Sequence, residues 1–153
     1  MNILFDTNIL IYIARDKSNY KILRAINPDN RNIHVSFASI AEIESISFQQ
    51  DWSKTKRQRL EFALDEAQIV ELNDTFLSTY VDIDAYSQRN HPEFLTYPFT
   101  TPRNMGKHDL WIAATASLLN LTLVTTDGDF DHLHNSFLDL RKVLPDELRP
   151  LLH

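Results

Sequence analysis

Residues 2–10, Asn2-Ile3-Leu4-Phe5-Asp6-Thr7-Asn8-Ile9-Leu10, decide the fold that this chain is expected to adopt. The run 2–5 predicts a short strand, and the residues from Thr7 onward predict a helix. Asp6 stands at the junction, so its carboxylate should lie where the strand ends. In an open α/β sheet that edge is where ligands bind.

The same alternation of short strands and helices continues along the chain, which favours a parallel sheet with helices on both faces. Further strands are expected near 33–36, 68–72, 121–124 and 137–140, and helices near 7–14, 20–26, 37–46, 54–67, 74–89 and 109–119. Residues 90–107 hold three prolines and predict a loop, part of which should pack through its aromatic residues. We expect one domain over residues 1–144, followed by a C-terminal tail or last turn over residues 145–153.

Three more acidic residues, Glu42, Asp109 and Asp127, stand near the ends of expected strands or the starts of helices. Each has a structural explanation when taken alone: Asp109 could cap a helix, Asp127 could form a turn and Glu42 could face solvent. Carboxylates gathered at one edge of a sheet repel one another and favour a hard divalent cation with oxygen ligands. The joint pattern therefore indicates a metal site.

Composition excludes several classes of protein. The chain has 153 residues, a net charge of −6, no cysteine and two glycines. It therefore lacks disulfides, thiolate metal sites and a glycine-rich phosphate loop. No apolar run reaches the roughly 18–20 residues that span a membrane, and no signal peptide is evident. We expect a protein without a membrane partner, and the absence of cysteine is compatible with the cytoplasm.

Four motifs occur in an order that resembles the PIN-domain ribonuclease family, and specifically its VapC-type toxins. They are Phe5-Asp6-Thr7-Asn8-Ile9-Leu10, Ser39-Ile40-Ala41-Glu42, Lys107-His108-Asp109-Leu110-Trp111-Ile112-Ala113-Ala114-Thr115-Ala116 and Leu123-Val124-Thr125-Thr126-Asp127-Gly128-Asp129-Phe130. A lone Asp-Thr-Asn would be a weak signal, but four motifs in order over residues 2–130 are a strong one.

The resemblance implies a three-layer α/β/α fold with about five parallel strands in the order 3-2-1-4-5. It implies that four catalytic residues bind Mg²⁺ or Mn²⁺: Asp6, Glu42, Asp109 and Asp127. Asn8 and Thr125 match the family's supporting amide and hydroxyl residues, and Asp129 is either an outer ligand or a turn residue. The implied activity is hydrolysis of RNA to 5′-phosphate and 3′-hydroxyl ends, by a homodimeric toxin restrained by a protein antitoxin.

Some features leave alternatives open. His108 stands where similar proteins often have asparagine, which suggests a different helix cap or a different neighbour of the metal ligands. The basic run Lys54, Lys56, Arg57 and Arg59 is either a solvated helix face or a contact for RNA, and Arg103 and Lys107 are better placed for phosphate contact. A PIN-like binding module without catalysis and a housekeeping RNA-processing nuclease remain alternatives. A haloacid-dehalogenase-like phosphatase is disfavoured, because Asn8 occupies the position of its second acid.

Overall fold

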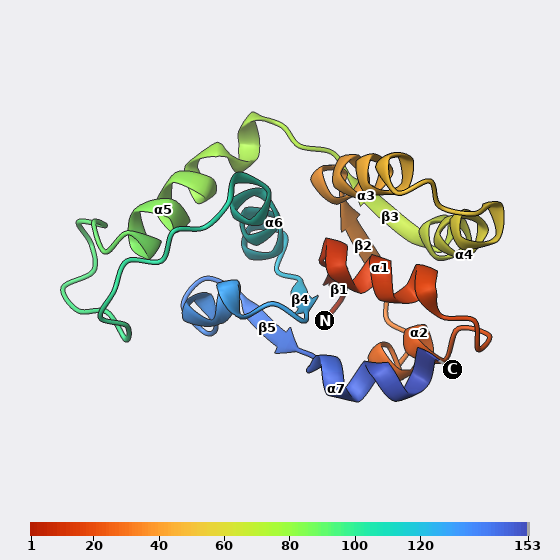
Figure 1. Cartoon of the computed structure of the whole chain (residues 1–153). Helices are drawn as coiled ribbons and strands as arrows, with labels where there is room; N and C mark the ends of the chain where they lie inside the picture. Colours follow the sequence, from red (N-terminus) through yellow and green to blue (C-terminus); the bar gives the residue numbers. More distant parts are fainter. Residues whose placement is uncertain (153) are drawn as a thin grey trace.

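A computed structural model describes residues 1–152. Its sheet is fully parallel and has five strands in the order β3-β2-β1-β4-β5 (Figure 1). The expected fold class and strand order are confirmed. The strands are β1 (Ile3–Phe5), β2 (Ile33–Ser36), β3 (Ala67–Val70), β4 (Thr122–Thr125) and β5 (Asp139–Lys142). Of the residues expected to form the C-terminal tail, His153 lies outside the described part of the chain.

The last strand begins two residues later than the sequence predicts. Phe137 and Leu138 do not pair along β4; their backbone N–H groups donate to the carbonyl of Leu133 in a tight turn. Leu138 is buried and Phe137 packs against the same core cluster. The apolar character of this segment therefore reflects core packing in a turn, and the strand itself is mostly exposed.

Helices cover both faces of the sheet (Figure 1). The α-helices are α1 (Thr7–Arg15), α2 (Lys21–Ile26), α3 (Phe37–Gln49), α4 (Lys54–Asp65), α5 (Leu77–Ser87), α6 (Lys107–Leu118) and α7 (Pro145–Leu148), and the 3-10 segments are η1 (Asp74–Phe76), η2 (Gly128–Leu133) and η3 (Arg149–Leu152). The helix expected over 74–89 thus starts as a 3-10 turn, and the one expected from Asp109 begins two residues earlier.

Two apolar cores sandwich the sheet, and β1 contributes to both because alternate side chains of a strand point to opposite faces. Ile3 and Phe5 join the core formed with α1, α2, α3, α4 and α7, whereas Leu4 joins the core formed with α5, α6 and η2. All three side chains are buried. This double burial holds the first strand in the centre of the sheet and places Asp6 beyond its end.

The loop between α5 and α6 is packed through its aromatic residues, as expected. Phe94, Tyr97 and Phe99 surround the fully buried ring of Tyr86, with ring centroids between 4.7 and 5.4 Å from it. The backbone N–H of Arg103 also donates to the carbonyl of Ser87 at 2.7 Å. These contacts determine how the chain approaches the start of α6, which carries Asp109.

The segment 145–152, expected to be a tail or last turn, folds into α7 and η3. Leu148 is buried, and Leu151 and Leu152 pack against the core on the α1 side of the sheet. These apolar contacts hold the segment against the rest of the domain. No helix within residues 1–152 has the length and apolar character needed to cross a membrane.

Candidate metal centre

Asp6 lies at the end of β1 and caps α1. Its Oδ1 accepts the backbone N–H of Thr7 at 2.7 Å, and its Oδ2 accepts the hydroxyl of Thr125 at 2.7 Å. Only 4% of Asp6 is exposed. Burial raises the pKa of Asp6 to about 6, although both hydrogen bonds oppose the shift and the charges of Asp127 and Glu42 add to it. The strand-to-helix junction therefore holds a carboxylate that is costly to ionise without a cation.

Thr125 links Asp6 to the loop that follows β4. Its hydroxyl donates to Asp6 and also accepts the backbone N–H of Asp127 at 3.0 Å. β1 and β4 are neighbours in parallel register, with Phe5 opposite Val124, so Thr125 stands beside Asp6. Thr125 is fully buried. One hydroxyl thus ties together the first and fourth sequence motifs.

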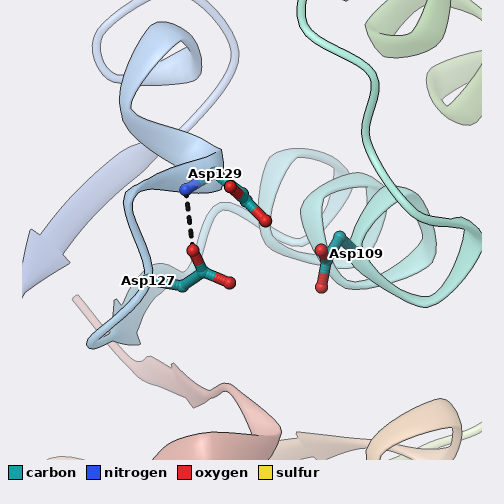
Figure 2. Close-up of side chains that lie close together, drawn as sticks. All are labelled: Asp109, Asp127 and Asp129. Carbon is teal, nitrogen blue, oxygen red and sulfur yellow. Dashed lines mark hydrogen bonds between the residues drawn. The ribbon is translucent and has the colours of Figure 1, made fainter.

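Asp127 and Asp129 are brought together by a turn. Asp127 Oδ1 accepts the backbone N–H of Asp129 at 2.9 Å, which caps η2 (Figure 2). An aspartate that bonds the backbone two residues on is a common way to tighten a turn. This turn aims both carboxylates in the same direction.

Asp109 faces these two carboxylates from α6. It is the third residue of that helix, whose N-cap is Gly106, so the helix does not open at Asp109 and the alternative that Asp109 is its cap is ruled out. Within residues 1–152 its carboxylate receives no hydrogen bond from the protein. Burial raises the pKa of Asp109 to about 7, with further increases from Asp6, Asp127, Asp129 and Glu42.

Asp109, Asp127 and Asp129 form the cluster best suited to hold a metal ion. One carboxylate oxygen from each lies within 4.8 Å of the others. Figure 2 shows the three side chains converging from α6 and from the loop after β4. Hard divalent cations bind oxygen ligands of this kind at about 2.0–2.6 Å. The donor set therefore fits Mg²⁺ or Mn²⁺.

Glu42 approaches the same region from α3. Its Oε2 lies 3.1 Å from Nδ1 of His108, the second residue of α6. Both side chains are partly exposed. The contact shows that His108 is a neighbour of an acidic site residue rather than a helix cap. Among the residues predicted from sequence, Glu42 and Asp6 stand beside the three-carboxylate cluster and influence it through their charges.

Several buried oxygens near these acids have no partner among the described residues. They are Asn8 Oδ1 and Thr7 Oγ1, which follow Asp6, and Ser39 Oγ, one helical turn before Glu42. Buried polar atoms are normally satisfied by protein or ordered water. Unpartnered oxygens beside carboxylates suit a hydrated cation, because the waters bound to the cation can donate hydrogen bonds to them. Asn8 is therefore consistent with the supporting role that the sequence suggests.

Arg103 contacts the acid-bearing loop, which is the segment after β4 that carries Asp127 and Asp129. Its guanidinium donates to the carbonyl of Gly128 at 3.0 Å, between Asp127 and Asp129. The sequence suggested a phosphate contact for Arg103, and the structure turns its side chain toward the protein. No local pattern reveals this contact, because the partner is 25 positions further along the chain. The sequence leaves Asp129 as either an outer ligand or a turn residue, and the structure places it in a turn with its carboxylate near those of Asp109 and Asp127.

These observations define an acidic site at the carboxyl edge of a parallel sheet, and the chain belongs to the PIN domain family. The family model described as PIN domain matches residues 3–135. That span contains every acidic residue of the site. A comparison with curated proteins finds no match.

Solved structures with the same fold include VapBC and Fit proteins, and one of these, VapBC-5, is described as a member of a family of toxin–antitoxin systems. VapBC2 from Rickettsia felis, bound to a DNA fragment from its promoter, matches with a TM-score of 0.71 at 21% identity and covers 93% of this chain and 98% of its own. VapBC-5 from Mycobacterium tuberculosis has a TM-score of 0.64 at 19% identity, with coverages of 93% and 98%. FitAcB from Neisseria gonorrhoeae has a TM-score of 0.63 at 24% identity, with coverages of 85% and 91%. At these identities the likeness shows a shared fold.

Proposed function

We propose that this chain is a Mg²⁺- or Mn²⁺-dependent endoribonuclease that acts as the toxin of a toxin–antitoxin pair. The observation that carries the proposal is the convergence of Asp109, Asp127 and Asp129 at the sheet edge beside Asp6. When bound, the cation lowers the pKa of a coordinated water and offsets charge on a phosphodiester.

Asp6, Glu42, Asp109 and Asp127 hold the cation in this proposal, and the geometry adds Asp129 to that set. The chain's other residues position these ligands. Thr125 fixes the Asp6 carboxylate and the start of the Asp127 turn, and Arg103 fixes the turn from the opposite side. His108 orients Glu42. Such supporting partners commonly determine how well a metal is held.

The test is cleavage of single-stranded RNA by the purified protein. Cleavage should require Mg²⁺ or Mn²⁺, should stop with EDTA, and should leave 5′-phosphate and 3′-hydroxyl ends. A protein that binds RNA without cutting it would be a binding module, and the catalytic proposal would be wrong. Release of phosphate from small monoesters would indicate a phosphatase instead.

The toxin role has its own test. Two structures that share this fold are described as a toxin–antitoxin complex and as a member of a family of toxin–antitoxin systems. Expression of the chain in bacteria should arrest growth, and Asp109→Asn should relieve the arrest. Co-expression with the protein encoded by the neighbouring reading frame should restore growth for the wild type. An active nuclease that leaves growth unaffected would favour a housekeeping role in RNA processing.

We further propose that the protein is a homodimer. The exposed side of α5 carries Leu77 and Val81, which are 52% and 54% exposed and stand one helical turn apart. Exposed apolar residues at this spacing suit packing against another helix. Light scattering at micromolar concentration should give the mass of a dimer. A monomer would contradict the assembly while leaving the catalytic proposal unaffected.

A further inference from the structure

A second site lies at the far end of α1. A cavity of about 410 Å³ is lined by Arg15, Lys17, Ser53, Lys56, Arg59 and Leu152. It is built from the last residue of α1, the start of α4 and the end of the described chain. Four of its six lining residues are cationic, in a chain whose net charge is −6.

The four cations of this pocket form no ion pair with any carboxylate of residues 1–152, and neutral groups hold three of them in place. Arg59 Nε donates to the carbonyl of Ala14 at 2.7 Å, and Lys56 Nζ lies 4.1 Å from the centre of the Trp52 ring. Arg15 lies over the ring of Tyr12. Neutral contacts therefore support three of the four cations, and none of the four is paired with an acid among residues 1–152.

The surroundings favour an anion in two further ways. Burial lowers the pKa of Lys56, and the like charges of Arg15 and Arg59 lower it further, so an anion would relieve this repulsion. Ser53 caps α4, a helix of 12 residues, and the helix dipole adds partial positive charge at that end. The apolar lining is limited to Leu152, which offers little surface to an apolar peptide side chain.

Helix α1 connects this pocket to the metal centre. Asp6 caps its first turn and Arg15 is its last residue, nine positions later, which spans roughly 14 Å at 1.5 Å per residue. Asn8, Ile11, Tyr12 and Arg15 recur at helical spacing and are at least partly exposed. One face of α1 therefore runs from the acidic site to the basic pocket. Tyr12, whose ring lies under the guanidinium of Arg15, stands between the two sites on this face.

We infer that the pocket of Arg15, Lys17, Lys56 and Arg59 binds a backbone phosphate of single-stranded RNA whose scissile phosphate lies at the metal centre. This inference rests on the proposed ribonuclease function. The roughly 14 Å length of α1 would separate the two phosphates, so the bound strand would span several nucleotides. The carboxylates of the acidic site repel a polyanion. A phosphate-binding pocket beyond that site therefore raises the affinity for RNA, which the carboxylates cannot do.

The experiment compares pocket and control variants of the full chain in binding a short fluorescent single-stranded RNA, with EDTA present so that no cleavage occurs. The pocket variant is Arg15→Gln with Lys56→Gln, which spares Arg59 and its bond to Ala14. The matched control is Lys54→Gln with Arg57→Gln, which removes two exposed cations from the same helix outside the pocket lining. Lys56→Arg retains the charge and should preserve binding. Melting temperatures verify that every variant is folded.

For wild type, the logarithm of the binding constant should fall linearly with the logarithm of salt concentration. The pocket variant should bind more weakly with every RNA sequence, and the magnitude of its salt slope should drop by about 0.7 for each phosphate that is no longer neutralised. The control should keep the wild-type slope. Equal losses of affinity in pocket and control variants, or no loss in either, would overturn the inference, because the effect would then come from overall charge or be absent.

The remaining outcomes separate this inference from the proposed function. Wild type that binds RNA through the pocket but never cleaves it would contradict the ribonuclease proposal and leave the phosphate site standing. RNA cleavage by wild type, together with unchanged RNA affinity in the pocket variant, would contradict the phosphate site and leave the ribonuclease proposal standing. If the variant keeps RNA binding but loses a co-expressed protein partner, the pocket serves an acidic protein segment and the RNA assignment is wrong.

Discussion

The two ends of α1 carry opposite charges, and the contacts around each charge differ. At its start, Asp6 is buried and joined by hydrogen bonds to Thr7 and Thr125, and burial raises the pKa of Asp6 and of its neighbour Asp109. At its end, Arg15 joins three other cations around an open pocket. The helix dipole, positive at the N-terminus and negative at the C-terminus, favours both placements. The same charges therefore stabilise α1 and leave each end in need of an external counter-ion.

The difference lies in what can neutralise each end. The acids lie close together, and Asp109 and Asp127 are partly buried, so a small hard cation fits between them. The bases line a wider cavity and are supported by neutral groups, so a larger, hydrated oxyanion fits there. In the proposed complex, an RNA strand places phosphates at both ends of α1, and only the acidic end needs a metal ion to bind one.

The largest expected effect comes from the acidic end. Asp109→Asn should lower RNA cleavage by roughly 10²–10³-fold or more, the loss typical when one electrostatic catalytic group is removed. Asp131→Asn is the matched control, because Asp131 lies in η2 close to the site but pairs with Lys142 at 2.7 Å. Initial rates of RNA cleavage measure both. Wild-type rates in Asp109→Asn would exclude Asp109 from the catalytic site.

Metal binding should stabilise the protein through the same carboxylates. Mg²⁺ or Mn²⁺ at 100 times its dissociation constant should add about 2.7 kcal/mol to the free energy of unfolding. For a domain of this size, at about 2–4 °C per kcal/mol, the melting temperature should rise by about 5–10 °C. Asp109→Asn should show a much smaller rise. Thermal melts with and without metal measure the difference, and equal rises in both proteins would place the cation elsewhere.

Thr125→Val tests how the buried Asp6 is supported. The change removes a hydroxyl bonded to Asp6 Oδ2 and to the backbone N–H of Asp127, so it should cost about 1–3 kcal/mol of stability. It should also raise the pKa of Asp6 further, because that hydrogen bond lowers it. Thr125→Ser keeps the hydroxyl and should behave like wild type apart from the missing methyl group. Denaturant unfolding measures both, and similar losses of stability in the two variants would assign the effect to packing.

A smaller effect is expected in the pH dependence of the metal-free protein. The pKa of Asp109 is raised from 3.8 to about 7, so the folded state binds a proton more tightly than the unfolded chain. Between about pH 4 and pH 7, rising pH should therefore destabilise wild type relative to Asp109→Asn. His132, whose pKa burial lowers to about 4, acts in the opposite direction, but it is present in both proteins and cancels in the difference. Melts in EDTA across this range test the sign, and a constant difference would show that Asp109 titrates normally.

Most of the acidic site could be located from the sequence for a physical reason. In a parallel sheet all strands end at one edge, so acids that follow strands along the chain meet in space. Asp6 and Asp127 follow that rule. Asp109 reaches the site from a helix instead, and the apolar run after it marked that helix as buried. Element ends were less certain: β5 starts later than expected because its apolar neighbours form a core turn.

The sequence by itself determined the alternation of strands and helices, the four motifs and the acids they carry, because these depend on neighbours a few positions apart. Only the tertiary structure decided the rest. It placed Asp129 beside Asp109, turned Arg103 onto the acid-bearing loop and set His108 against Glu42. It also assembled the basic pocket from α1, α4 and residues near the C-terminus. These contacts join side chains distant along the chain, and their geometry follows from how the helices pack on the sheet.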